Sequence, residues 1–123
     1  MDNLKDIESE LRIKLAAAHH VIKHYNYDDL LATHLSARIP NTKHILITPM
    51  DTPFEEVCAS NLLKVDLDGN IISSNNKKLM PQAINIHAGV YKNSDKIMSA
   101  MHTHSIYGVA TSTLKSGILF FNQ

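Results

Sequence analysis

The sequence predicts a single α/β domain in which helices pack on a sheet. Three observations support this class: a long amphipathic segment opens the chain, short apolar or alternating segments separated by turn residues follow, and a second helical pattern begins at Pro81. Packing helices on a sheet buries the apolar faces of both. A length of 123 residues is typical of one domain, so we assign residues 1–123 to a single domain.

The composition argues against several classes of protein. Twelve basic and twelve acidic side chains cancel, which predicts no general attraction to nucleic acid or to an anionic membrane. No apolar run approaches the ~20 residues of a membrane span, and the start of the chain does not resemble a signal peptide. Cys58 is the only cysteine, which excludes an internal disulfide and fits a cytoplasmic protein. We interpret Cys58 as a small core residue.

Residues 3–25 are predicted to form the first helix. Apolar side chains recur there at steps of three and four residues, so they share one face. Acidic residues crowd the start and basic residues lie toward the end, an order that suits the helix dipole. His19, His20 and His24 are expected on the helix surface.

Three short strands are predicted next. Residues 31–38 and 44–48 are the first two, with a turn at Pro40-Asn41 between them. A helical turn with proline in first position follows at residues 53–57. Residues 63–67 alternate apolar and polar side chains, as a half-buried strand does. Asp68-Gly69 is a hairpin turn signal, so the chain should then turn back.

A second helix is predicted from Pro81 to Tyr91, and Ile84, His87, Ala88 and Tyr91 share one of its faces. Proline suits the first helical position because its missing N–H has no partner there. We expect the shared face, His87 included, to lie toward the sheet.

The segment after this helix carries a candidate metal site. Residues 97–101 are short, apolar and uncharged, which predicts a strand buried on both faces. His102 and His104 follow, and residues two apart on a strand point to the same side. Two imidazoles can each reach one ion at about 2.0 to 2.1 Å and supply half of a tetrahedral zinc site. The alternative is a pair of ordinary polar residues at a surface turn.

The last part of the chain predicts one more helix and one more strand. Ser105 can cap a helix that begins at Ile106 and ends near residues 115–117, with Tyr107 in the core. Residues 118–121 are an apolar run that we predict to be a strand. Such a strand either closes a small sheet or belongs to a larger domain. An apolar strand at an open edge recruits other chains, so we expect self-association.

Six motifs in a fixed order carry a resemblance to a known family. They are T-H-L-S-A-R at 33–38, I-L-I-T-P at 45–49, A-S-N-L-L-K-V-D-L-D-G-N at 59–70, I-H-A-G-V-Y at 86–91, M-H-T-H-S at 101–105 and K-S-G-I-L-F-F-N-Q at 115–123. Each is weak alone, but their order and spacing together are specific. The chain resembles the class II aldolase and adducin amino-terminal domain, and its details are closest to the adducin-like branch.

The resemblance implies a fold, a metal and a reaction. The family fold is a three-layer αβα arrangement with a central, largely antiparallel sheet. Its catalytic members bind zinc through an H-x-H pair and a third histidine, and they cleave or form a carbon–carbon bond beside a ketose carbonyl by stabilising an enediolate. The pair maps onto His102 and His104, which implies Zn²⁺ or another divalent metal and a small carbonyl or sugar-like substrate. The third histidine and later strands have no match, so the domain is expected to be incomplete at its carboxyl end.

This chain departs from the family pattern at positions that matter for catalysis. Sugar-phosphate aldolases of the family carry a glutamate four residues before the histidine that matches His87. Ala83 stands there, and it can neither bind metal nor transfer a proton. The places that match the phosphate pocket of those aldolases are Thr33, His34, Met50, Asp51, Pro81 and Gln82. Met50 offers no donor, and Asp51 repels a phosphate dianion.

His34 and His87 are the candidates for an additional site residue or third ligand. For His87 we favour a structural histidine that faces the sheet and is hydrogen-bonded. For His34 a structural hydrogen bond and a role in the site are equally open. We expect Arg38 to bind backbone carbonyls or pair with an acid within the scaffold rather than to bind phosphate.

Two functions follow from the sequence. The first is a zinc-dependent class II aldolase-type lyase acting on a small carbonyl or sugar-derived compound. The second is a non-catalytic, adducin-like scaffold domain or truncated remnant. The H-x-H pair favours metal binding, whereas Ala83 and the missing third histidine favour the second function.

Overall fold

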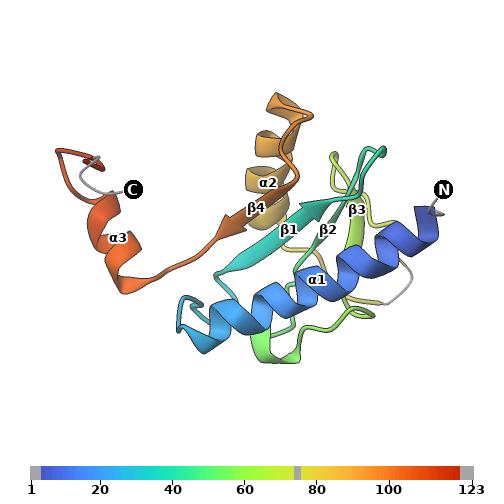
Figure 1. Ribbon diagram of the computed structural model, residues 1–123, viewed down its shortest axis with the longest axis horizontal. Helices are drawn as coiled ribbons and strands as arrows, with labels where there is room; N and C mark the ends of the chain where they lie inside the picture. The colour runs from blue at the N-terminus through green and yellow to red at the C-terminus, as the bar shows by residue number, and fades with distance from the viewer. Residues whose placement is uncertain (1–3, 74–75, 120–123) are drawn as a thin grey trace.

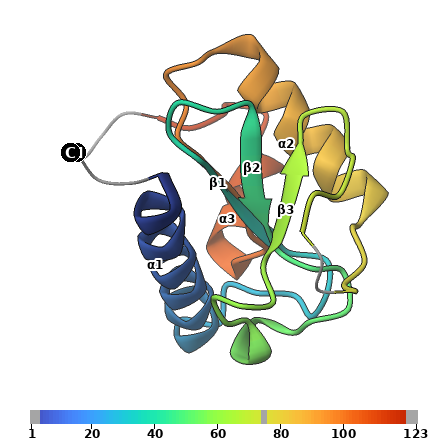
Figure 2. The same ribbon diagram turned by 90° about the vertical axis from the view of Figure 1, so that its right-hand side faces the viewer.

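The computed structural model describes residues 4–73 and 76–119, which form three layers (Figure 1). Helices α1 and α2 cover opposite faces of a four-stranded sheet (Figure 2). The strand order is β3-β2-β1-β4, and each neighbouring pair is antiparallel. The predicted α/β class is thus confirmed. The elements are α1 (Leu4–His24), β1 (His34–Arg38), β2 (His44–Ile47), the 3-10 helix η1 (Phe54–Glu56), β3 (Leu63–Asp66), α2 (Pro81–Asn93), β4 (Ser99–His102) and α3 (Ile106–Ser112).

Helices α1 and α2 each pack an apolar face against one side of the sheet. Leu15 and Ala16 of α1 pack with Leu35 of β1, Leu46 of β2 and Phe54 of η1. On the opposite face, α2 packs on the sheet through a second cluster. Its buried members are Ile45, Ile47, Leu63, Val65, Ala83, Ile84, Ala88 and Tyr91. The apolar face predicted for the second helix does lie toward the sheet.

β1 is buried on both faces, yet only one face is apolar. Leu35 and Ala37 pack in the α1 layer. His34, Ser36 and Arg38 alternate with them and are buried on the other side, toward α2. Buried polar groups are stable only when they are hydrogen-bonded, so α2 must supply partners for this polar face.

His19 is buried rather than on the surface of α1, so that expectation was wrong. Its side chain is 0% exposed and makes two hydrogen bonds, from Nδ1 to the Leu15 carbonyl and between Nε2 and Thr48 Oγ1, both at 2.7 Å. The polar ring of His19 is stable in the buried layer between α1 and the sheet because both of its nitrogens are hydrogen-bonded. Burial lowers the pKa of His19 to about 4.

β4 differs from the strand predicted at 97–101. It begins at Ser99, and its residues are alternately exposed and half-buried because it lies at the edge of the sheet. Within the described residues it pairs with β1 alone. Met101 is 65% exposed, so the prediction of burial on both faces was wrong.

Two predicted core residues are exposed. Cys58 lies in the turn after η1, with its Sγ 3.2 Å from Ser60 Oγ, instead of in the core. Tyr107 is 82% exposed because α3 extends away from the sheet and buries none of its residues (Figure 1). The predicted strand at 118–121 is not formed at 118–119, and its last two residues lie outside the described part.

Several local signals are confirmed. Ser105 caps α3, since its Oγ accepts a hydrogen bond from the Gly108 N–H at 3.1 Å. Pro81 occupies the first position of α2. Gly69 has φ +90° in the turn after β3, a conformation that favours glycine. No helix among the described residues is long and apolar enough to cross a membrane.

The lowered pKa of His19 predicts acid sensitivity. The unfolded state, with a pKa near 6.5, takes up a proton before the folded state does, so the contribution of His19 to stability is complete above pH 6.5 and is lost as the pH drops toward 4. From pH 7 to pH 5, His19 alone should lower the free energy of unfolding by roughly 2 kcal/mol.

Urea denaturation at both pH values tests this. His19→Gln should lose less stability between pH 7 and pH 5 than the unaltered chain, whereas His24→Gln, on the exposed face of the same helix, should lose as much. An unchanged loss in His19→Gln would refute the assignment.

Candidate metal centre

The pairing of β1 with β4 assembles a cluster of histidines. His34 lies directly opposite His102 in the antiparallel register, so both side chains project on the α2 side of the sheet. Their rings are stacked, with centroids 4.8 Å apart and planes inclined by 18°. The contact between His34 and His102 therefore depends on strand register and not on a local sequence motif.

His102 and His104 converge at the end of β4. Their Nε2 atoms are 3.0 Å apart, although β4 ends at His102 and His104 lies in the connection to α3. The backbone N–H of His104 donates to the Tyr27 carbonyl at 3.0 Å, which fixes this connection. The two histidines do project together, as their spacing predicted.

Asp29 orients His104. Its Oδ2 lies 2.9 Å from His104 Nδ1. An ionised carboxylate only accepts, so Nδ1 of His104 carries the hydrogen and donates it. With that hydrogen on Nδ1, His104 accepts a hydrogen bond from His102 at Nε2, and an imidazole held by a carboxylate in this way is the arrangement found around metal-bound histidines. Sequence reasoning missed Asp29.

His34 and His87 form the buried floor of the cluster. His34 Nδ1 lies 2.7 Å from His87 Nε2, and His87 Nδ1 is hydrogen-bonded to Ser36 Oγ. Ser36 Oγ also lies 2.8 Å from the Tyr91 hydroxyl. Burial lowers the pKa of both histidines to about 4, and for His34 the neighbouring His102 and His104 add to the effect. Both rings are therefore neutral at pH 7.

These contacts bear on the roles of His34 and His87, for which the sequence left a structural role and a role in the site open. His87 faces the sheet, is 1% exposed and has both ring nitrogens hydrogen-bonded, as favoured from the sequence. In the part of the chain that the structure describes, no three side chains among His, Cys, Asp and Glu converge as a metal-binding group. The structure thus brings together a pair of nitrogens, with His34 beside the pair.

The structure shows the surroundings of the residues at which this chain departs from the catalytic pattern of the family. Ala83 is 1% exposed and belongs to the apolar cluster beneath α2, so no carboxylate stands at this place. Asp51 Oδ1 lies 3.7 Å from Lys77 Nζ, and Met50 beside it is 41% exposed.

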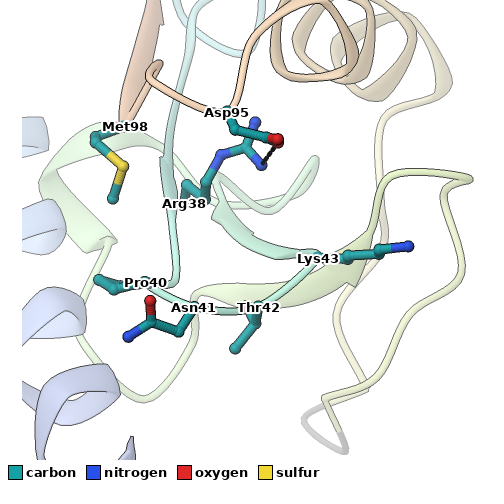
Figure 3. A pocket seen from close by; sticks show the side chains of 7 residues that line it. All are labelled: Arg38, Pro40, Asn41, Thr42, Lys43, Asp95 and Met98. Atoms are coloured by element: carbon teal, nitrogen blue, oxygen red, sulfur yellow. Dashed lines mark hydrogen bonds and ion pairs between the residues drawn. The ribbon is translucent and has the colours of Figure 1, made fainter.

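Arg38 lies at the opposite end of β1 from the histidines, against a hollow of about 470 Å³ (Figure 3). Its guanidinium donates to the carbonyls of Ile97 at 3.0 Å, Tyr91 at 2.7 Å and Ser94 at 3.1 Å, and it pairs with Asp95 at 3.4 Å. These contacts tie α2 and the segment that leads into β4 to β1. The expected scaffold role of Arg38 is confirmed.

Comparison with known proteins decides the family. The family model described as "Class II Aldolase and Adducin N-terminal domain" matches residues 13–123. The chain belongs to the class II aldolase and adducin N-terminal domain family. The resemblance found in the sequence motifs is therefore confirmed.

Two relatives illustrate both branches of this family. A candidate aldolase class 2 protein of Caulobacter vibrioides is 38% identical over 98% of this chain and 47% of its own length. Human gamma-adducin is 32% identical over 94% of this chain and 17% of its own length. The chain thus spans about half the length of the first relative and much less of the second.

Solved structures agree with the fold. An aldolase II superfamily protein from Pseudomonas syringae has a TM-score of 0.88 and 36% identity, covering 92% of this chain and 46% of that chain. The L-fuculose 1-phosphate aldolase of Glaciozyma antarctica has a TM-score of 0.84 over 92% of this chain and 47% of its own. At 24% identity, the second likeness shows the fold alone.

Removing the Arg38 side chain should destabilise the protein strongly. We expect Arg38→Ala to lower the free energy of unfolding by at least about 2 kcal/mol, because hydrogen bonds from a charged donor contribute about 1.5–3 kcal/mol each and three carbonyls lose theirs. Lys43 lines the same hollow and is exposed, so Lys43→Ala is the matched control and should change stability by less than about 0.5 kcal/mol. Equal effects of both variants in urea denaturation would contradict the scaffold role.

Proposed function

We propose that this chain provides a zinc-binding site of the class II aldolase type, acting on a small carbonyl or sugar-derived compound. The observation that supports it most is the convergence of His102 Nε2 and His104 Nε2, with Asp29 orienting His104. Imidazole nitrogens suit zinc, and sites that act on substrates leave positions open for water or substrate.

The side chains present fit such an ion. His104 has its lone pair on Nε2 because Nδ1 donates its hydrogen to Asp29, and this lone pair accepts from His102 Nε2. A bound ion would replace the hydrogen between the two Nε2 atoms, which would be released as a proton. Zinc, when bound, supplies Lewis-acid polarisation of a substrate carbonyl. His34 and His87, neutral and buried next to the pair, add no positive charge that would oppose a cation.

A non-catalytic, adducin-like role is the second candidate. It is favoured by Ala83, whose methyl group packs in an apolar cluster and cannot act as a general acid or base. Such groups contribute about 10²- to 10⁴-fold to a rate, so a chain that binds zinc without cleaving a ketose would support this role.

Metal uptake tests the first proposal. We expect one zinc per chain by elemental analysis of protein equilibrated with the ion, and none in a His102→Ala, His104→Ala double variant. Binding should be weak, because two imidazoles are one short of the three protein ligands usual in catalytic zinc centres. Asp29→Asn should weaken binding about 10- to 100-fold, as loss of an orienting partner does at metal sites. His24→Ala, on an exposed position of α1, is the control and should bind as the unaltered chain does. Equal zinc in the unaltered chain and the double variant would refute the site.

We further expect self-association with a second copy of this chain. Support comes from the outer edge of β4, which has no strand partner among the described residues, and from α3, where Ile106 and Tyr107 are each 82% exposed. Light scattering at tens of micromolar should show a mass above that of a monomer, and Tyr107→Lys should lower it. A monomeric mass with a sharp cooperative melt would contradict this expectation.

A further inference from the structure

A buried guanidinium lines a surface hollow at the end of β1 that lies away from the histidines. Figure 3 shows the Arg38 side chain among the others that line this hollow, whose volume is about 470 Å³. Clefts of about 300–1,000 Å³ are the size that holds small molecules. Arg38 is 7% exposed, so its charge is almost wholly removed from water. A buried charge needs partners, so the bonds of each nitrogen decide what else Arg38 can bind.

Three of the five N–H hydrogens of Arg38 are used within the scaffold. Nε donates to the Ile97 carbonyl at 3.0 Å, and Nη2 donates to the carbonyls of Tyr91 at 2.7 Å and Ser94 at 3.1 Å. The Tyr91 ring also lies against the guanidinium, with its centroid 5.0 Å from Cζ. These contacts fix the plane of the guanidinium and leave Nη1 as the nitrogen that a ligand can reach.

Nη1 is only weakly paired. Its one partner among the described residues is Asp95, whose Oδ1 lies 3.4 Å away. Hydrogen bonds between charged partners are typically about 2.7–2.9 Å long, so this contact is a loose one. The Asp95 side chain is fully exposed, and exposed ion pairs contribute little to stability. Asp95 can therefore leave Nη1 at small cost, and its carboxylate marks the place where another carboxylate would bind.

The remaining walls of the hollow suit a small organic acid. Arg38 and Lys43 are the two cations that line it and Asp95 is the one acid, so the balance of charge is positive. Lys43 is exposed and forms no ion pair with a described residue, which leaves its ammonium group free to turn toward an anion. Pro40 and Met98 line the same hollow and offer apolar surface to a hydrocarbon chain. An anion with an aliphatic part fits these walls better than an inorganic ion does.

We propose that this hollow is a second ligand site, which binds a small aliphatic carboxylate. The carboxylate of the ligand takes the place of Asp95 at Nη1 of Arg38, Lys43 turns to it as a second cation, and the hydrocarbon chain lies on Pro40 and Met98. Arg38 keeps its scaffold role through Nε and Nη2. The site is separate from the histidine cluster and uses no metal, so it stands or fails independently of the proposed zinc site.

Titration with butyrate tests this site in the full chain. In ¹H–¹⁵N spectra, butyrate should shift the amide signals of Asp95 and Met98 until they saturate, and inorganic phosphate at equal ionic strength should bind more weakly. Asp95→Asn should bind butyrate about two- to fivefold more tightly, because the internal competitor has lost its charge. Lys43→Ala should bind it about two- to fivefold more weakly. Lys115→Ala removes the same charge from an exposed position beyond α3 and should bind as the unaltered chain does.

These variants leave Arg38 in place, because its removal is expected to destabilise the fold. Thermal melts of each variant verify folding. Shifts that do not saturate would overturn the proposal, as would phosphate binding as tight as that of butyrate. So would an Asp95→Asn variant that binds butyrate no more tightly than the unaltered chain, or equal affinities of Lys43→Ala and Lys115→Ala.

Discussion

The need to satisfy the polar face of β1 governs the rest of the structure. A central strand that buries histidine, serine and arginine side chains is stable only when each finds a hydrogen-bond partner. Helix α2 supplies those partners through His87, the Tyr91 hydroxyl and backbone carbonyls at its end. The position of α2 over the sheet is therefore fixed by directional bonds as well as by apolar packing, and this sets where the candidate site lies.

The two ends of β1 have different consequences. At one end, Arg38 links β1, α2 and the segment that leads into β4 through carbonyls and serves the scaffold. At the other end, His34 meets His102 across the strand pair, and His104 follows with Asp29 behind it. One strand thus connects a structural network to a potential metal centre. A slip of one residue between β1 and β4 would turn His102 to the opposite face and separate the two histidines.

Local patterns in the sequence were sufficient to predict most helices and strands and the pair of His102 and His104. The periodicity of α1, Pro81, the Ser105 cap and the spacing of His102 and His104 depend on neighbouring residues, and such signals survive folding. The contacts of His19 with Thr48 and of Asp29 with His104 join residues 29 and 75 positions apart, so no local pattern could reveal them. Whether a strand lies at the edge or in the centre is likewise a property of the assembled sheet. The apolar run at residues 97–101 therefore predicts a buried strand, although β4 lies at the edge of the sheet.

The central proposal is that His102 and His104 each supply one ring nitrogen to the same metal ion. X-ray absorption at the zinc edge of the zinc-loaded full chain tests this most directly. The account predicts two imidazoles per zinc at about 2.0 to 2.1 Å, with oxygens completing the tetrahedron. A spectrum that shows fewer than two imidazoles per zinc would contradict it.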